Sequence, residues 1–170
     1  MTLKPEDLYH SAVIVDDVQA TIERLAATTG MRFAPVMDTP FPVRIDGETR
    51  TLDMTLTYSV DAPHLEVVRA MPGTPWTTLP GRPLHHIGFW VDDLEAASRD
   101  LEAGGAALEV CGSGEAIGPY VFAYHVGPDG LRIEIVDRAT EPGFRAWLAA
   151  ADRPGAQEPL GRNTTMIAPD

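Results

Sequence analysis

Two histidines that lie 76 residues apart open similar stretches of this sequence. His10 begins the run HSAVIVDDV and His86 begins HIGFWVDDL, and seven of the nineteen residues at positions 9–27 recur at that spacing. Later in each stretch a glutamate stands between apolar residues, as Glu66 and as Glu134. Two imidazoles and two carboxylates form a donor set that suits Zn, Ni, Co, Mn or Fe. The residue types therefore predict one divalent metal site, if the fold brings the four side chains together.

The first predicted strand of each stretch directs its histidine away from the helix that follows. Successive residues of a strand point to opposite faces of a sheet. Valines in residues 9–15 pack toward the helix, so that His10 points to the opposite, concave face. In residues 84–91 the same alternation leaves His86 and Trp90 on that face. Each stretch thus contributes one histidine, and Trp90 is a candidate substrate-binding residue.

The last predicted strand of each stretch repeats this arrangement with a glutamate. Glu66 lies in residues 65–69 and Glu134 in residues 131–136, each between apolar neighbours that face the helix. An unpaired carboxylate on an enclosed face would cost free energy. The duplicated placement therefore favours a ligand role for both glutamates.

Three more residues are weaker candidates for the site. In their predicted strands, His64 points to the same face as Glu66, and Arg132 points to the same face as Glu134. Both side chains could reach the cavity and bind substrate, or could lie at its rim. His85 has the wrong facing for the concave side, which predicts a structural or exposed position.

Each stretch reads as one strand, one helix and three further strands. The helices are predicted to begin at capping boxes, Asp16 with Gln19 and Asp92 with Glu95, and they carry apolar residues at helical spacing. The further strands are predicted over residues 31–37, 52–58, 65–69, 106–110, 120–126 and 131–136. This order predicts an α+β fold of two tandem βαβββ modules.

The modules leave room for a linker and a C-terminal element. Residues 1–70 are expected to form the first module and residues 84–138 the second. Between them, residues 71–83 contain four prolines, which predicts an extended linker. Residues 139–170 are expected to form a short helix, capped by Thr140, and a tail.

The composition is that of an ordinary globular protein, with 170 residues of which 44% are hydrophobic and 22% charged. The net charge of -12 argues against nucleic acid and anionic membranes as partners. A single cysteine, Cys111, excludes an intrachain disulfide framework and a cysteine-based zinc site. No apolar run reaches the roughly 20 residues of a membrane span, and residues 1–10 lack the features of a signal peptide, so a cytoplasmic location is expected.

The chain resembles the vicinal oxygen chelate superfamily, which includes glyoxalase I, methylmalonyl-CoA epimerase, extradiol dioxygenases and bleomycin-resistance proteins. The likeness spans about residues 8–138 and rests on the repeated His-x4-Val-x-Asp pattern and on the closing run GPDGLRIEIV. It implies a U-shaped mixed sheet that encloses a cavity around one divalent metal ion. By this resemblance the ligands are His10, Glu66, His86 and Glu134, a set most similar to that of glyoxalase I.

The resemblance implies a metal-dependent isomerase, epimerase or lyase. A divalent ion that binds substrate oxygens stabilises the enolate formed when a proton beside a carbonyl is removed. In glyoxalase-like members a glutamate of the metal site moves this proton, which makes Glu134 or Glu66 the candidate base. The expected partner is a small carbonyl or vicinal-oxygen compound, and many relatives form homodimers.

Two other functions occur within the same superfamily. A ring-cleaving extradiol dioxygenase uses two histidines and one carboxylate around Fe(II), and a fourth ligand at Glu66 would occupy the position that oxygen needs. Drug-binding resistance proteins of this fold hold cationic compounds in acidic grooves, which suits the net charge, but they generally lack the metal ligands. Bound metal distinguishes the enzymes from the binding proteins.

Overall fold

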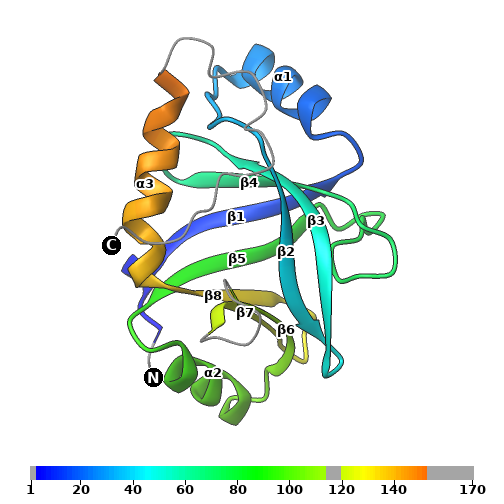
Figure 1. The fold of residues 1–170 in the computed structure, drawn as a ribbon, viewed down its shortest axis with the longest axis vertical. Helices are drawn as coiled ribbons and strands as arrows, with labels where there is room; N and C mark the ends of the chain where they lie inside the picture. Colours follow the sequence, from blue (N-terminus) through cyan, green and yellow to red (C-terminus); the bar gives the residue numbers. More distant parts are fainter. Residues whose placement is uncertain (1–2, 114–119, 153–170) are drawn as a thin grey trace.

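The chain forms an eight-stranded barrel built from two modules of equal topology (Figure 1). This computed structural model describes residues 3–113 and 120–152. The first module consists of β1 (Leu8–Val15), α1 (Val18–Thr29), β2 (Met37–Ile45), β3 (Glu48–Tyr58) and β4 (His64–Arg69). The second consists of β5 (Leu84–Val91), α2 (Leu94–Ala103), β6 (Ala107–Ser113), β7 (Tyr120–Val126) and β8 (Arg132–Asp137). Helix α3 (Glu141–Ala149) follows, and short 3-10 turns lie at Pro5–Asp7, Arg138–Thr140 and Ala150–Asp152.

The strand order around the barrel is β1-β4-β3-β2-β6-β7-β8-β5. The first and last strands of each module pair in parallel, β1 with β4 and β5 with β8. The remaining pairs within each module are antiparallel. Antiparallel pairing of β1 with β5 forms the central seam between the modules. The closing seam, β2 with β6, involves only residues 43–45 and 110–112. The predicted fold class is confirmed, and the expected U-shaped sheet closes into a barrel at this short seam.

Each module helix begins one residue later than the capping-box pattern predicted. The Asp17 carboxylate accepts a hydrogen bond from the amide of Ala20 at 2.9 Å, and Asp93 does the same for Ala96 at 2.9 Å. Both caps have extended backbone dihedrals, which is the conformation from which a carboxylate reaches the third helical amide. The second aspartate of each pair is therefore the cap, and the prediction of Asp16 and Asp92 was wrong.

The second strand of the first module lies later than predicted. In residues 31–37 only Phe33 makes a strand-like bridge, to Ser59, whereas β2 starts at Met37. Strand β2 contains Pro40 and Pro42, which lack an amide hydrogen and argue against a strand in sequence. Within the described residues, β2 pairs with β3 along its whole length and with β6 at residues 43–45, so neither proline lies in the described part of the β2–β6 pairing.

Apolar side chains fill the barrel and attach the helices to it. Helix α1 packs on the outer face through Val18 and Ile22, and α2 through Leu94 and Ala97. Helix α3 instead contributes to the interior cluster, with the buried residues Phe144, Trp147 and Leu148. The Trp147 indole also donates a hydrogen bond to the carbonyl of Pro35 at 2.9 Å. Thr140 precedes α3, but its side chain does not cap it and donates to the Asp137 carbonyl instead.

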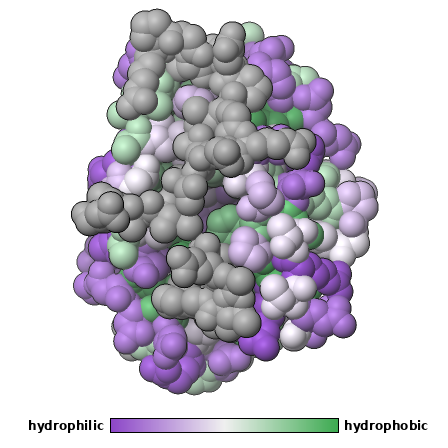
Figure 2. All heavy atoms as spheres, viewed as in Figure 1, coloured by the Kyte–Doolittle hydropathy of each residue, from purple (hydrophilic) through white to green (hydrophobic). Residues whose placement is uncertain are grey.

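Both ends of the barrel are covered from outside the sheet. Helix α3 lies across the end where β1 begins, as its contacts with Tyr9 and Tyr58 show. The segment between the modules covers the opposite end and inserts Trp76, which has no exposed surface. Hydrophilic residues gather over the α2 end of the face drawn in Figure 2. No helix in the described residues is long and apolar enough to cross a membrane.

Candidate metal centre

Four adjacent strands carry the predicted ligands to one point inside the barrel. The order β4-β1-β5-β8 aligns Glu66, His10, His86 and Glu134 across the central seam. The Nε2 atom of His10 lies 2.9 Å from Nε2 of His86 and 3.1 Å from Oε2 of Glu134. The Nε2 atom of His86 lies 3.1 Å from Oε2 of Glu66 and 3.4 Å from Oε2 of Glu134. The structure thus brings together all four residues, hereafter the four-residue cluster.

The cluster is buried, and one oxygen of each glutamate lacks a hydrogen-bond partner. The exposed fractions of His10, Glu66, His86 and Glu134 are 2%, 5%, 0% and 6%. Oε2 of Glu66 and Oε2 of Glu134 are buried without a hydrogen-bond partner. Buried carboxylate oxygens without a donor are costly, and a cation bound between the two histidines and the two glutamates would reduce that cost. Two imidazole nitrogens and two carboxylate oxygens fit a divalent transition metal.

Three of the four residues form the tighter part of the cluster. Ligand atoms of His10, His86 and Glu134 all lie within 4.8 Å of one another. Glu66 approaches from the far side, with its Oε2 atom 3.7 Å from Nε2 of His10. Burial raises the pKa of the Tyr58 hydroxyl well above its ordinary value, and the nearby charge of Glu66 adds to this rise.

The charges of the cluster oppose one another across short distances. Burial disfavours the charged form of His86, but the charge of Glu134 and hydrogen bonds to both glutamates outweigh it and raise the pKa of His86 to about 9. Burial likewise disfavours ionised Glu134, yet the neighbouring imidazoles hold its pKa below the ordinary range. A divalent ion bound at the same point would compete with protons for the imidazole nitrogens.

A hydrogen-bonded chain fixes which nitrogen of His86 faces the cluster. Nε2 of His85 lies 2.9 Å from the carbonyl oxygen of Pro75, which can only accept, so this nitrogen carries a hydrogen. Burial and the charges of His86 and Arg132 lower the pKa of His85 to about 4, which leaves its Nδ1 as an acceptor. Nδ1 of His86 donates to it at 2.8 Å. Nε2 of His86 therefore points its lone pair or proton at Glu66 and Glu134.

The position of His10 depends on the absence of a side chain at Gly88. These two residues face each other across the central seam. A Cβ atom added to Gly88 would lie 1.9 Å from Cε1 of His10, far inside van der Waals contact. The glycine therefore provides the space that the His10 imidazole occupies.

Aromatic rings enclose the cluster on both sides. Toward α3, Tyr9 packs against His10 with 4.3 Å between ring centroids, and Trp90 stacks on Tyr9 at 3.9 Å. On the other side Tyr124 lies 4.8 Å from His86, and its hydroxyl accepts a hydrogen bond from the Trp76 indole at 3.2 Å. Trp90 thus faces the interior as predicted, but its ring is already covered by Tyr9.

The other predicted residues lie at opposite ends of the barrel. Nδ1 of His64 donates to the Ser59 carbonyl at 2.9 Å, and its ring packs on Phe144 of α3. Arg132 lies at the end that is covered by the linker, where it pairs with Glu109 at 2.6 Å. Both residues are half-buried, and within the described residues no side-chain hydrogen bond or ion pair links either of them to the cluster.

Sequence reasoning missed the roles of two residues beside the cluster. His85 was expected to be structural or exposed, but it is only 8% exposed and hydrogen-bonds His86. Strand alternation failed here because the β1–β5 pairing shifts register next to this residue. The consecutive histidines in the sequence were the signal that could have indicated a role for His85 beside His86. The signal at Gly88 was weaker: a glycine inside a strand indicates close approach of another group.

A family model described as "Glyoxalase/Bleomycin resistance protein/Dioxygenase superfamily" matches residues 9–124. The chain belongs to this superfamily. The match confirms the resemblance to the vicinal oxygen chelate proteins that the repeated motif predicted. No protein of curated function matches the sequence.

Several solved structures share the fold at low sequence identity. A hypothetical protein from Bacillus halodurans superposes with a TM-score of 0.52 at 13% identity, covering 76% of this chain and 92% of that one. Variants of Streptomyces coelicolor methylmalonyl-CoA epimerase, in complex with 2-nitronate-propionyl-CoA, superpose with TM-scores of 0.51 and 0.50. The first has 17% identity and covers 81% of this chain and 95% of the epimerase; the second has 18% identity and covers 77% and 96%. These likenesses concern the fold.

Proposed function

We propose that this protein is a divalent-metal-dependent isomerase, epimerase or lyase that removes a proton beside a carbonyl group. The observation that supports this most strongly is the convergence of two imidazoles and two carboxylates at one buried point, with two carboxylate oxygens left without a donor. His10, Glu66, His86 and Glu134 would hold the ion. When bound, a Zn, Ni, Co, Mn or Fe ion would supply positive charge that stabilises a developing enolate oxygen.

The residues around the cluster suit this chemistry. Tyr9, Tyr58 and Tyr124 surround the site with rings, which keep water out and strengthen charge interactions inside it. A carboxylate must accept the substrate proton, and Glu66 and Glu134 are the two within the site. Of these, Glu66 lies outside the tighter group of three. We therefore favour Glu66 as the base and Glu134 as the more firmly held ligand.

Metal analysis and proton exchange test the proposal together. Protein freed of metal and then reloaded with Zn, Ni, Co, Mn or Fe is incubated in D2O with thioesters, α-hydroxy ketones and other small carbonyl compounds. Proton NMR then measures loss of the hydrogen beside the carbonyl. The proposal predicts about one ion per chain and exchange that depends on it.

Two matched variants separate the roles of the glutamates. Glu66→Gln should abolish exchange while the protein still binds an ion, and Glu134→Gln should weaken ion binding as well. Glu95→Gln removes an exposed carboxylate on α2 and serves as the control. A protein that binds small organic cations but no metal would contradict the proposal and indicate a binding function instead. Full exchange in both cluster variants would overturn the assignment of the base.

A further inference from the structure

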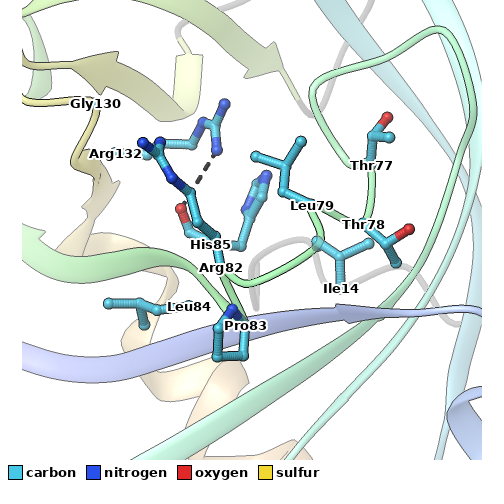
Figure 3. A pocket seen from close by; sticks show the side chains of 10 residues that line it. All are labelled: Ile14, Thr77, Thr78, Leu79, Arg82, Pro83, Leu84, His85, Gly130 and Arg132. Atoms are coloured by element: carbon cyan, nitrogen blue, oxygen red, sulfur yellow. Dashed lines mark hydrogen bonds between the residues drawn. The ribbon is translucent and has the colours of Figure 1, made fainter.

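A pocket with a basic lining opens at the end of the barrel where β1 finishes and where β5 and β8 begin (Figure 3). Its lining includes Arg82, His85 and Arg132, and none of the described residues that line it is an aspartate or a glutamate. The hydroxyl-bearing residues Thr77 and Thr78 lie on its opposite wall. This lining contrasts with the net charge of -12 of the whole chain. Concentrated positive charge in a concave site attracts an anionic ligand.

Arg132 is held in one position at this pocket. Its guanidinium donates two hydrogen bonds to Glu109, at 2.6 and 2.8 Å, and one to the His85 carbonyl at 3.3 Å. The side chain is 13% exposed. Glu109 balances the charge of Arg132, so that the additional charge of the pocket must come from another residue.

Arg82 supplies that additional charge. Within the described part of the chain it forms no ion pair and no side-chain hydrogen bond. In Figure 3 its side chain extends toward the same end of the pocket as that of Arg132. One of its terminal nitrogens lies 3.3 Å from the place that a Cβ atom of Gly130 would take, so this turn glycine leaves room for the guanidinium. An unpaired guanidinium presents a planar fork that matches carboxylate and phosphate oxygens.

The pocket and the four-residue cluster lie along the same interior face. Arg132 and Glu134 are two residues apart on β8, which places them roughly 7 Å apart on one side of the strand. Ile14 lines the pocket from β1 and has the same facing as His10. His85 belongs to the pocket lining and contacts His86 of the cluster.

We infer that this pocket binds an oxyanion, the carboxylate or phosphate at one end of the substrate, while the reacting carbonyl lies at the four-residue cluster. This inference rests on the proposed function and adds the substrate class to it. The substrate is a carbonyl compound whose anionic group lies roughly 7 Å or more from the reacting carbon, the separation of Arg132 and Glu134 along β8. Arg82 binds the anion directly, and Arg132 forms the fixed wall beside it.

A binding experiment tests the pocket without any reaction. Metal-free protein at low ionic strength is titrated with inorganic phosphate, with propionate and with neutral propionamide, and the arginine side-chain NMR signals are followed. Phosphate or propionate should shift the signal of Arg82, and propionamide should not. Arg82→Gln should weaken anion binding at least tenfold, whereas Arg99→Gln on α2 removes an equal charge and should leave it unchanged. Unchanged binding in Arg82→Gln, or no binding to the unaltered protein, would overturn the site.

A kinetic experiment tests the substrate class in the metal-loaded protein. Arg82→Gln should raise KM for anionic carbonyl compounds at least tenfold more than KM for neutral ones, whereas the control Arg99→Gln should change neither. Equal effects on anionic and neutral compounds would overturn the inference. Anion binding requires no metal. A protein that binds phosphate but no divalent metal ion would therefore refute the proposed function and leave the pocket standing. A protein that is active with a divalent metal ion but unaffected by Arg82→Gln would refute anion binding in the pocket and leave the proposed function standing.

Discussion

Nδ1 of His86 lies 2.8 Å from Nδ1 of His85, and the far side of the His85 ring lies 2.9 Å from the Pro75 carbonyl. This chain connects the segment between the modules to the centre of the barrel. It fixes the orientation of His86, because each nitrogen along the chain has only one role that its neighbour permits. If His86 binds an ion as proposed, His85 would position that ligand without contacting the ion.

The first prediction concerns this positioning role. His85→Leu removes the acceptor for His86 Nδ1 and should weaken zinc binding by about 10- to 100-fold, the usual cost of losing the partner of a ligating histidine. His85→Gln keeps an amide donor and acceptor and should retain most of the affinity. Competition with a chelator measures both. His125→Leu alters a buried histidine that contacts none of the cluster, and it should bind zinc normally. Normal affinity in His85→Leu would show that the chain has no positioning role.

The second prediction concerns the space for His10. Gly88→Ala places a methyl group 1.9 Å from the position of Cε1 of His10 and should displace the imidazole. Zinc stoichiometry, measured after dialysis, should fall well below that of the unaltered protein while circular dichroism still shows the fold. Gly143→Ala in α3 is the matched control, because a Cβ atom there meets nothing within 4 Å. This control should bind zinc fully and gain up to about 1 kcal/mol of stability from helix propensity. A fully loaded Gly88→Ala protein would contradict the role given to Gly88.

The third prediction concerns the pH dependence of stability. His125 is buried beneath α2, where its Nε2 atom lies 2.8 Å from the Ser98 hydroxyl, and burial lowers its pKa below the ordinary 6.5 although Glu102 partly opposes this. The unfolded chain therefore binds a proton at higher pH than the folded chain. Stability contributed by neutral His125 is present above pH 6.5 and declines as the pH falls toward the folded-state pKa.

Urea titrations of metal-free protein between pH 8 and pH 5 measure this decline. The difference between the unaltered protein and His125→Gln isolates the contribution of His125, because the cluster histidines are present in both. The unaltered protein should lose more stability than the variant as the pH falls. Parallel pH profiles would disprove the contribution.

The fourth prediction concerns Arg138, which joins three parts of the chain. Its guanidinium pairs with Asp7 at 2.7 Å, with Asp92 at 2.6 Å and with Glu141 at 3.7 Å. Arg138→Gln should lower the free energy of unfolding by about 1 kcal/mol, since the pairs are partly exposed and solvent weakens each of them. Arg145→Gln breaks a single exposed pair on α3 and should cost roughly 0.3 kcal/mol. The difference between the variants should shrink in 1 M salt, and a difference that persists there would exclude an electrostatic origin.

The duplicated pattern predicted most of the fold and the convergence of the cluster. His10 and His86 could be assigned to a common face because the apolar residues that alternate with them were expected to face the helices. The same reasoning failed at His85, where the register shifts between paired strands and a side chain of the wrong parity turns inward. Irregular pairing is a property of two strands together, so one strand's sequence does not reveal it.

The missed strand and the missed pocket have related causes. Strand β2 contains two prolines, which argue against a strand in sequence, yet it pairs with β3 along its whole length. The pocket joins Arg82 of the linker to Arg132 of β8, residues that no sequence period connects. Repeats predict the features that both modules share, whereas these features belong to one module or to the segment between them.

The central seam also determines what each half of the chain could do alone. Each module supplies one imidazole and one carboxylate, and the four groups meet only where β1 pairs with β5. A separated half would present two donors, too few for a closed coordination sphere. An ion bound at the seam would therefore act as a cross-link between the two halves. Its removal should weaken the association of the first module with the second.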